Sequence, residues 1–461
     1  MFALPGICGL VIFILIRPQE SIGALAGLPL LHACAGLALL GFIVDLRLRR
    51  LEPRGVPSLP WVAAFAVWVL LCNAVRIPDQ FTTRATELAI LLVIYGTIAH
   101  ACQRFRALQL VTGVVMSACL MLAAIGIHQH LQPRQCIVLS NAEGTEGDAD
   151  GRLCDDTPRC YDDLDGDPAA NYRCERAGVL GTHSIQDRIR YRGELHDPNE
   201  LALTLGIGGL SFVIASFLRR RGGLGAITYL AAAAMVAWAV LLTQSRGGLV
   251  VAAAVPGVYF VRRFGVAGLF AGLLAAAPVM MLGGGGRDAA SAETSTLMRY
   301  EAWASGLDMF HSSPLFGVGQ RQFTEHHFLT AHNTYVLTLA ELGLVGMVLF
   351  VMILWASIKA LYVGVRQLDD VPGARVARVW GMAMLASMLG LAFQIQTLSF
   401  AYHSVLWIFV GLAGAWVSAV RRHLPRFEVQ IGLPDVAVVA SLCTLYALVI
   451  LPVFLRIKGA M

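Results

Sequence analysis

Charged side chains are scarce in this sequence of 461 residues. Lys and Arg number 35 and Asp and Glu 30, which is 14% of the chain, whereas soluble domains average about 25%. Apolar residues make up 57%, enough for around thirteen bilayer crossings at about 20 residues each. The net charge of +5 is small and the arginines are scattered. This composition excludes a soluble globular protein, a disordered chain and a nucleic-acid binder.

Long apolar runs follow one another along most of the chain. They lie near residues 3–16, 22–45, 58–76, 85–101, 105–128, 198–218, 223–243, 247–261, 264–282, 334–364, 376–396, 400–420 and 434–455. The runs predict an all-α polytopic membrane protein with about 12 to 14 transmembrane helices. The number of transmembrane helices would change if the short first run, or the tight hairpin at 243–247 or 397–400, were a re-entrant segment. Residues 24–26 have cleavage-site spacing, but no basic flank precedes the first run, so we expect an uncleaved helix there.

Basic residues fall on alternate connections, as the cytoplasmic retention of Lys and Arg requires. With the start of the chain inside, the cytoplasmic clusters are Arg47, Arg49, Arg50 and Arg54; Arg104 and Arg106; Arg219–Arg221; Arg262 and Arg263; Lys359, Arg366, Arg375 and Arg378; and Arg421, Arg422 and Arg426.

Two segments that are too polar for lipid then lie outside. The sequence predicts N-terminal membrane helices in 1–128, a first periplasmic loop rich in Cys and Asp at 129–197, central membrane helices in 198–282, a second periplasmic loop with an amphipathic helix at 283–333, and C-terminal membrane helices in 334–461. We expect the functional residues in and beside these two large outer-face loops.

The first outer loop carries four of the ten cysteines, Cys136, Cys154, Cys160 and Cys174. Outside the cytoplasm they are candidates for two disulfides, and three connectivities are possible. The same loop is acidic, and Asp163, Asp165 and Asp167 resemble part of a calcium loop. No twelve-residue loop with a terminal Glu is complete, so a solvated, disulfide-stapled loop is the favoured interpretation and structural calcium the alternative.

The first outer loop ends in RYRGELHDPNELAL, where Asp197, Pro198 and Asn199 predict a helix start. A capping role alone would explain Asn199. Arg188, Arg190 and Arg192 make this end basic, which favours an anion at the membrane surface or pairing with the acidic residues of the loop.

The second outer loop contains STLMRYEAWASGLDMF, whose helical periodicity places Arg299, Trp303 and Phe310 on one stripe. Such an amphipathic helix suits the membrane interface. Arg299 would lie at headgroup depth, where a guanidinium binds phosphate in a bidentate manner or simply extends toward water.

His332 and Asn333 follow this loop at the outer end of a long apolar helix. Stepping 100° per residue puts Gly343 and Gly346 on the face of His332, which predicts close approach of a neighbouring helix there. On the same count Glu341 lies opposite His332. The His326, His327 and His332 spacing fits no common closed zinc site, and we expect no metal.

TQSRGG places Arg246 at an outer hairpin between two apolar helices. An arginine at the membrane boundary is costly without a partner or a task. Its alternative role is an interfacial anchor. Glu87 and Glu341 fall within spans and are candidate partners for such an arginine.

Together, RGELHDPNELAL, TQSRGG, the MRYEAW to SPLFGVG stretch and HNTYVLTLAELGLVG resemble the O-antigen ligase and polymerase (Wzy-like) family. The last follows the ligase-type pattern of His, Asn, nine residues, Gly, two residues, Gly. Some ligases follow the second Gly with two threonines, where this chain has Met347 and Val348. The Cys and Asp insert is also outside the family pattern.

The resemblance implies a GT-C-type membrane glycosyltransferase that takes a glycan from undecaprenyl (polyprenyl) diphosphate on the periplasmic side of the inner membrane, without a cofactor. By position, Arg246 and Arg299 would bind the diphosphate and His332 would act on the acceptor, supported by Asn199, Asn333 and Arg192. The acceptor is another lipid-linked repeat, a lipid A core or a protein hydroxyl. Membrane lipids and other polysaccharide-assembly proteins are the remaining expected partners.

Overall fold

The computed structural model describes residues 1–140, 147–162, 167, 169–219, 222–268, 270, 272, 289–421 and 423–460. These residues form two compact units. Unit 1 consists of Met1–Ile7, His32–Val111 and Arg287–Met461, and unit 2 of Cys8–Leu31 and Thr112–Gly286. Three of the boundaries fall within helices, namely α1 (Ala3–Leu15), α3 (Leu30–Arg47) and α6 (Phe105–Leu131).

The predicted all-α polytopic membrane fold is confirmed. Within the described residues, ten helices are long and apolar enough to cross a membrane, and Ala3–Leu15 and Ser404–Val420 are shorter apolar helices. Most of the predicted apolar runs coincide with these helices to within a few residues. The run at 264–282 lies mostly outside the described residues, and the GT-C architecture stays a prediction.

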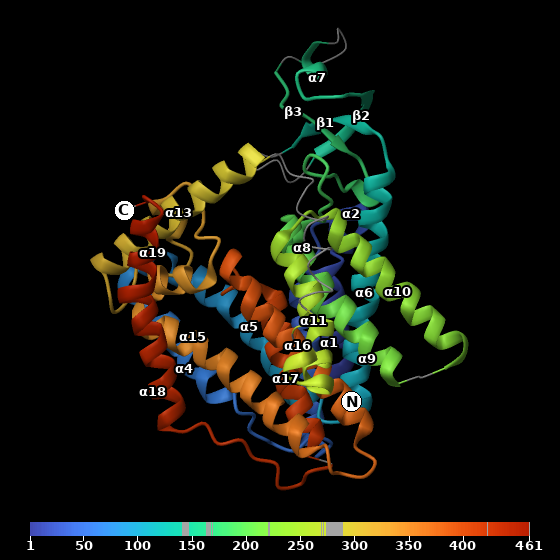
Figure 1. Cartoon of the computed structure of the whole chain (residues 1–461), viewed down its shortest axis with the longest axis vertical. Coiled ribbons are helices and arrows are strands. Elements are labelled where there is room, and N and C mark those ends of the chain that lie inside the picture. Colours follow the sequence, from blue (N-terminus) through green and yellow to red (C-terminus); the bar gives the residue numbers. More distant parts are fainter. Residues whose placement is uncertain are drawn as a thin grey trace. The chain divides into compact units, whose positions relative to one another are not determined.

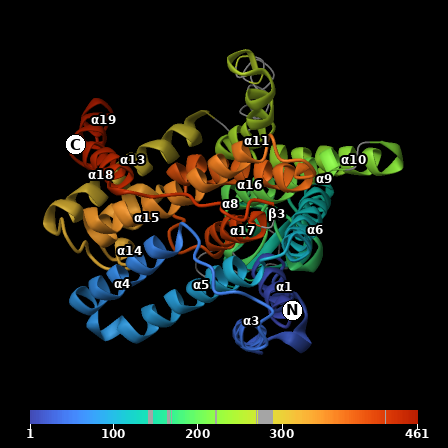
Figure 2. The same cartoon turned by 90° about the horizontal axis from the view of Figure 1, so that it is seen from below.

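Unit 1 is a helical bundle (Figure 1). Its remaining helices are α3 (Leu30–Arg47), α4 (Leu59–Arg76), α5 (Phe81–Ala101), α13 (Ala289–Ser312), α14 (Phe323–His326), α15 (Thr334–Gln367), α16 (Arg375–Gln394), α17 (Ser404–Val420), α18 (Leu433–Leu445) and α19 (Leu451–Ile457). Helix α17 packs on α5, and α15 packs on α4, α16 and α17 (Figure 2). The aromatic rings of Phe65, Phe350 and Trp407 pack together in this core. The ring centroid of Phe65 lies 6.0 Å from that of Phe350 and 6.1 Å from that of Trp407.

Unit 2 combines membrane helices with a small sheet. Its helices are α2 (Pro18–Ser21), α7 (Arg159–Asp162), α8 (Pro198–Thr204), α9 (Ser211–Arg219), α10 (Gly223–Leu242) and α11 (Arg246–Phe264), and a π-helical segment, Leu205–Leu210, joins α8 to α9. Gly248 lets α11 approach α8, because a Cβ there would lie 2.3 Å from that of Ala202.

The first outer loop folds as an antiparallel sheet of β1 (Arg134–Leu139), β2 (Gly147–Leu153) and β3 (Tyr172–Arg176), in the order β2-β1-β3. Two disulfides, Cys136–Cys160 and Cys154–Cys174, hold it. The sequence left the connectivity open and did not predict the strands. The alternation of polar and apolar residues that would predict a strand is missing from β2, because its sequence, GDADGRL, is almost wholly polar and the strand is exposed.

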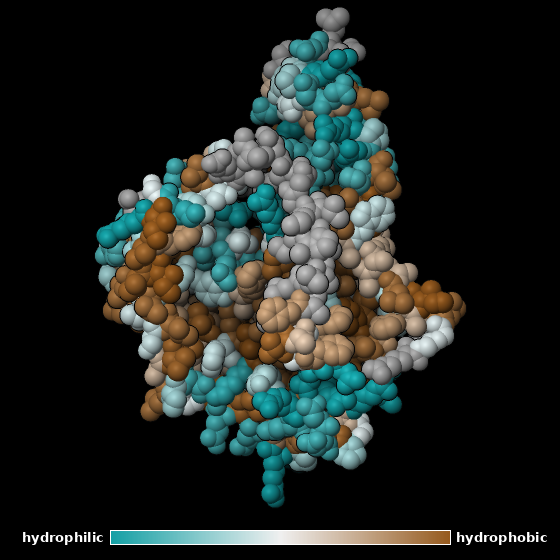
Figure 3. Space-filling model, in the orientation of Figure 1, coloured by the Kyte–Doolittle hydropathy of each residue, from teal (hydrophilic) through white to brown (hydrophobic). Residues whose placement is uncertain are grey.

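Apolar side chains remain exposed on helices that have no protein neighbour on one face. Leu442, Leu445, Leu448 and Val449 in the α18–α19 segment are 45–56% exposed, and Figure 3 shows the resulting hydrophobic column. Such a surface is stable in lipid.

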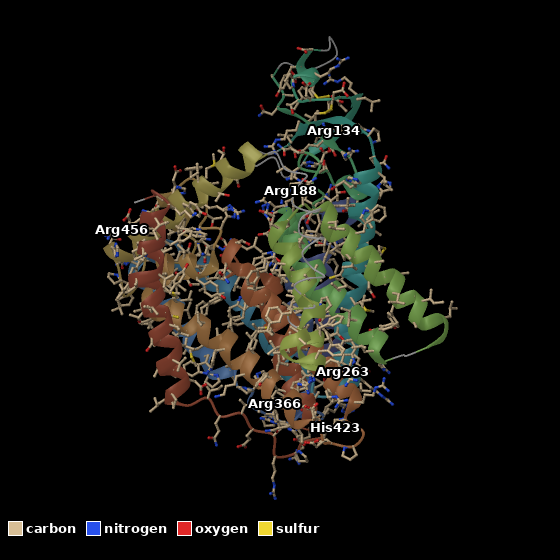
Figure 4. The ribbon with its side chains drawn as sticks, viewed as in Figure 1. Arg134, Arg188, Arg263, Arg366, His423 and Arg456 are labelled. Carbon is tan, nitrogen blue, oxygen red and sulfur yellow. A yellow bond between two sulfur atoms is a disulfide. The ribbon has the colours of Figure 1, made fainter. Side chains whose placement is uncertain are left out.

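Arg366 and Arg263, two of the basic residues that the sequence assigns to the cytoplasm, each lie at one end of their unit. In unit 1, Arg366 and His423 lie at the end opposite Arg456 (Figure 4). In unit 2, Arg263 lies at the end opposite Arg134 and Arg188.

Candidate functional site

His332 lies just before α15, in a left-handed backbone conformation with φ of 45°. Its backbone N–H donates to Ser399 Oγ at 3.0 Å, and that hydroxyl also bonds Thr330 Oγ1 at 2.8 Å. The side chain of His332 is half-buried. The hairpin that contains Ser399 therefore fixes the backbone that carries the imidazole.

Asn333 is the N-cap of α15 and is 3% exposed. Its Oδ1 accepts from the N–H groups of Tyr335 at 3.0 Å and Val336 at 3.3 Å, and its Nδ2 donates to Tyr446 OH at 3.4 Å. The amide thus satisfies two of the orphan donors at the helix start. Asn333 holds the first turn of α15 beside His332.

The helical positions counted from His332 are wrong, because His332 precedes the helix and α15 is broken at Gly343, where φ is 68°. A Cβ at Gly343 would lie 2.2 Å from Leu315 O, so the glycine admits the loop 313–319 rather than a neighbouring helix. At Gly346 the nearest atom belongs to Leu342 of the same helix.

The loop 313–319 satisfies the backbone groups that the break leaves open. The N–H groups of Val318 and Gly319 donate to the carbonyls of Ala340 and Glu341, at 3.0 and 2.9 Å, and Leu344 N–H donates to Pro314 O at 3.0 Å. Trp68 Nε1 bonds Leu342 O at 2.9 Å. A broken membrane helix requires such partners, so the loop and the outer half of α15 form one rigid piece.

The two glutamates within spans have partners other than Arg246. Glu87 pairs with Arg84 at 3.2 Å and with Arg321 at 3.1 Å. Glu341 is buried, and its Oε1 accepts from Phe323 N–H at 3.2 Å. Both carboxylates tie the segment 321–323 to the bundle of unit 1.

Arg299 lies on α13, which packs against α15. One turn later on the same face, Trp303 Nε1 donates to the carbonyl of Ala331, next to His332, at 2.8 Å. Gly306 allows the close approach, since a Cβ there would lie 2.7 Å from Val336 Cγ1. Helix α13 therefore brings the half-buried Arg299 to the end of α15 where His332 lies.

Arg246 lies in unit 2, exposed at the first position of α11. Ser245 caps this helix by accepting from Gly248 N–H at 3.1 Å. Beside this hairpin, the buried Arg188 donates through Nε to Thr243 O at 2.9 Å and reaches Asn199 Oδ1 at 3.3 Å. Unit 2 thus gathers Arg188, Asn199 and the Arg246 hairpin in one place.

The predicted helix start at Asp197–Asn199 is present. Asp197 is the N-cap of α8 and accepts from both the backbone N–H and the Nδ2 of Asn199, each at 2.7 Å. Asn199 is therefore shared between the cap of α8 and the guanidinium of Arg188. The sequence signal for Arg188 is the run of basic residues at the end of the first outer loop.

Arg192 and Arg190 both form contacts within unit 2. The guanidinium of Arg192 donates to Glu20 O and Gly181 O, both at 2.6 Å. Arg190 is buried with His183 and Glu175. Burial lowers the pKa of Arg190, and the nearby Glu175 charge partly offsets this.

Of the predicted calcium ligands, Asp163 and Asp165 lie outside the described residues. Asp167 accepts through Oδ1 from Ala169 N–H at 2.9 Å, which is an ordinary turn contact. Calcium in this loop stays a prediction.

These features define a polytopic α-helical membrane protein with Arg188 beside the Arg246 hairpin in unit 2 and a histidine whose backbone is held by Ser399 in unit 1. Residues 201–351, about a third of the chain, match the family model described as O-antigen ligase. The match confirms the resemblance to the O-antigen ligase and polymerase family, and it supports a membrane enzyme of that type acting on lipid-linked and acceptor glycans. Arg246, Arg299, His332 and Asn333 all lie within the matched region. No curated protein matches the chain.

Proposed function

We propose that this chain is a glycosyltransferase that moves a glycan from polyprenyl diphosphate to an acceptor hydroxyl, on the periplasmic side of the bacterial inner membrane. The observation that carries this proposal is His332, fixed between Ser399 and the Asn333 cap inside the region that matches the O-antigen ligase family. Repeat-unit polymerisation is the favoured activity.

The arginines suit the leaving group of this reaction. Transfer breaks the bond between the anomeric carbon and a phosphate oxygen, so negative charge builds on the departing diphosphate. A guanidinium binds such an anion through two parallel hydrogen bonds. Arg246, exposed at the start of α11, and Arg299 on α13 are the proposed ligands. In a water-poor site two such groups stabilise the transition state by several kcal/mol.

His332 is the proposed general base. The acceptor hydroxyl must lose its proton as it attacks, and a neutral imidazole accepts a proton near neutral pH. The new bond joins the acceptor oxygen to the anomeric carbon, while the diphosphate leaves with the electron pair of the broken bond. No metal or cofactor is required in this scheme.

The decisive variant is His332→Asn. Asn tolerates the left-handed conformation at this position, so it removes the imidazole while the backbone stays. We expect transfer from a labelled lipid-linked glycan in reconstituted vesicles to fall about 10²- to 10⁴-fold, with unchanged thermal stability. His332→Ala should lose activity as well, and the exposed neighbour variant His326→Ala should keep it. Normal transfer by His332→Asn would exclude the proposed base.

Ligation to a lipid A core or to a protein hydroxyl is the alternative within the same chemistry. Polymerase is favoured because Met347 and Val348 stand where some ligases carry two threonines. Deleting the gene separates the two activities. Loss of a polymerase leaves single repeats on the surface, whereas loss of a ligase leaves polymer that is not attached.

Two other classes predict different results. A polysaccharide or lipid transporter would move labelled glycan across the vesicle membrane without forming a glycosidic bond. A structural scaffold would tolerate replacement of Arg246, Arg299 and His332 together.

A further inference from the structure

A cavity of about 630 Å³ lies in unit 1 at the start of two helices. Arg104, just before α6, and Phe105 and Arg106 in its first turn line one side, and Val376 and Ala377 line the cavity from the first turn of α16. His423, beyond the end of α17, completes the wall. Three segments that are far apart in the sequence therefore form one cavity.

The cavity lies at the predicted cytoplasmic end of unit 1. Figure 4 shows His423 at the same end as Arg366 and opposite Arg456. The catalytic candidates of unit 1 lie elsewhere, because His332 precedes the start of α15 whereas Arg366 belongs to its last turn. The cavity is thus separate from the proposed glycosyl-transfer residues.

The lining is cationic without compensating carboxylates. Arg104 and Arg106 are exposed and form no ion pair within the described part of the chain, and none of the described lining residues is acidic. By contrast, Arg378 on the same face pairs with Asp369 at 3.4 Å. The N-cap of α16, Ala374, has no side chain that could cap the first-turn N–H groups. The wall therefore offers positive charge to an anion.

The other side of the cavity is apolar. Phe105 packs against His423, with ring centroids 5.7 Å apart, and Val376 is 36% exposed. A ligand that suits both sides has an anionic head and an apolar body. Basic cavities between membrane helices on the cytoplasmic side take anionic lipid headgroups in this way.

We propose that this cavity binds the phosphate headgroup of an anionic phospholipid, with Arg104 and Arg106 as its principal ligands. The phosphate receives hydrogen bonds from the two guanidinium groups. The glycerol and the first acyl carbons contact Phe105 and Val376.

The test uses the full chain in a non-ionic detergent. Native mass spectrometry counts retained lipid during titration with short-chain phosphatidylglycerol, with phosphatidylcholine as the neutral comparison. We expect selective retention of phosphatidylglycerol by the unaltered chain and about 30-fold weaker binding by the double variant Arg104→Gln, Arg106→Gln. Arg47→Gln with Arg49→Gln is the matched control, because these exposed arginines have the same spacing and the same predicted side.

Three results would overturn the proposal. The first is equal retention of phosphatidylglycerol and phosphatidylcholine by the unaltered chain. This comparison does not depend on the folding of any variant. The second is an equal loss in both double variants, which indicates general surface charge. The third is inorganic phosphate or glycerol phosphate displacing the lipid at equal concentration, which assigns the cavity to a soluble anion instead.

Discussion

At the scale of single residues, two backbone positions shape the candidate site of unit 1. His332 and Gly343 both have positive φ, at 45° and 68°. A β-carbon makes this conformation costly by roughly 1–2 kcal/mol. His332 holds it because Ser399, Asn333 and Trp303 fix the chain on either side. The strain lies at the residue that the family pattern marks, as is common at functional sites.

Gly343→Ala should destabilise the protein strongly. The new Cβ would meet Leu315 O at 2.2 Å and would also have to adopt positive φ, so we expect a loss of about 2 kcal/mol or more. Thermal unfolding of the purified chain measures it. Gly96→Ala on α5 is the control, since nothing lies within 4 Å of its Cβ and a small gain is expected. Equal melting temperatures for the two variants would contradict this account of the break.

The sequence predicted this region in part. The pattern of His, Asn and two glycines located His332 and the start of α15, because Asn is a strong capping residue. It misassigned the role of Gly343, because counting 100° per residue assumes a continuous helix. A left-handed break depends on the loop 313–319, whose contacts are long-range, so local periodicity carried no signal of it.

At the scale of elements, Asp187 links two neighbouring strands of the sheet, the central strand β1 and the edge strand β3. It pairs with Arg134 at the start of β1 and with Arg176 at the end of β3. These pairs, with the Arg134 hydrogen bond the largest cause, hold the pKa of Asp187 below its usual 3.8. The ionised carboxylate therefore stabilises the folded loop above pH 3.8, and this contribution is lost as the pH falls through the lowered pKa.

Asp187→Asn should remove this pH dependence. At neutral pH we expect faster hydrogen exchange in β1 and β3 of the variant than of the unaltered chain. The effect should stay below about 1 kcal/mol, because the Asp187 side chain is 41% exposed. The ratio of the exchange rate of the variant to that of the unaltered chain, taken at each pH, is free of the intrinsic exchange rate. This ratio should approach one well below pH 3.8. A ratio that is constant with pH would argue against the ion pairs.

The disulfides give a second prediction for the same element. Alkylation of the denatured chain without reduction should modify six cysteines and, after reduction, all ten. Replacing Cys154 and Cys174 with Ser should destabilise the loop by about 2–5 kcal/mol and increase proteolysis between 134 and 176. Replacing the free Cys8 and Cys34 should not. Modification of all ten before reduction would contradict both the pairing and the predicted periplasmic location.

Elements were predictable from the sequence where lipid imposes them. A helix that crosses a membrane needs a long apolar run, so α4, α10 and α16 matched their predicted bounds closely. The strands β1 to β3 were not predicted, since disulfides and ion pairs hold them instead of an apolar face. The supporting role of Arg192 stays a prediction, and its contacts with the carbonyls of Glu20 and Gly181 were not predictable because these residues are remote in sequence.

At the scale of the whole molecule, the proposed reaction uses residues from both units. Arg246 belongs to unit 2, whereas Arg299 and His332 belong to unit 1. One diphosphate must contact both arginines within the length of its own bonds, since a guanidinium acts on phosphate through direct hydrogen bonds. The proposed function therefore predicts that Arg246 and Arg299 bind the same diphosphate.

Spin labels test this requirement. We expect double electron–electron resonance to give a shorter distance between spin labels on Cys at positions 246 and 299 than between labels on Cys at positions 263 and 299. The control is matched, because Arg246 and Arg263 are at opposite ends of α11, about 25 Å apart along the helix. If the 263–299 pair is the closer one, the two arginines do not share a diphosphate and His332 must act without Arg246.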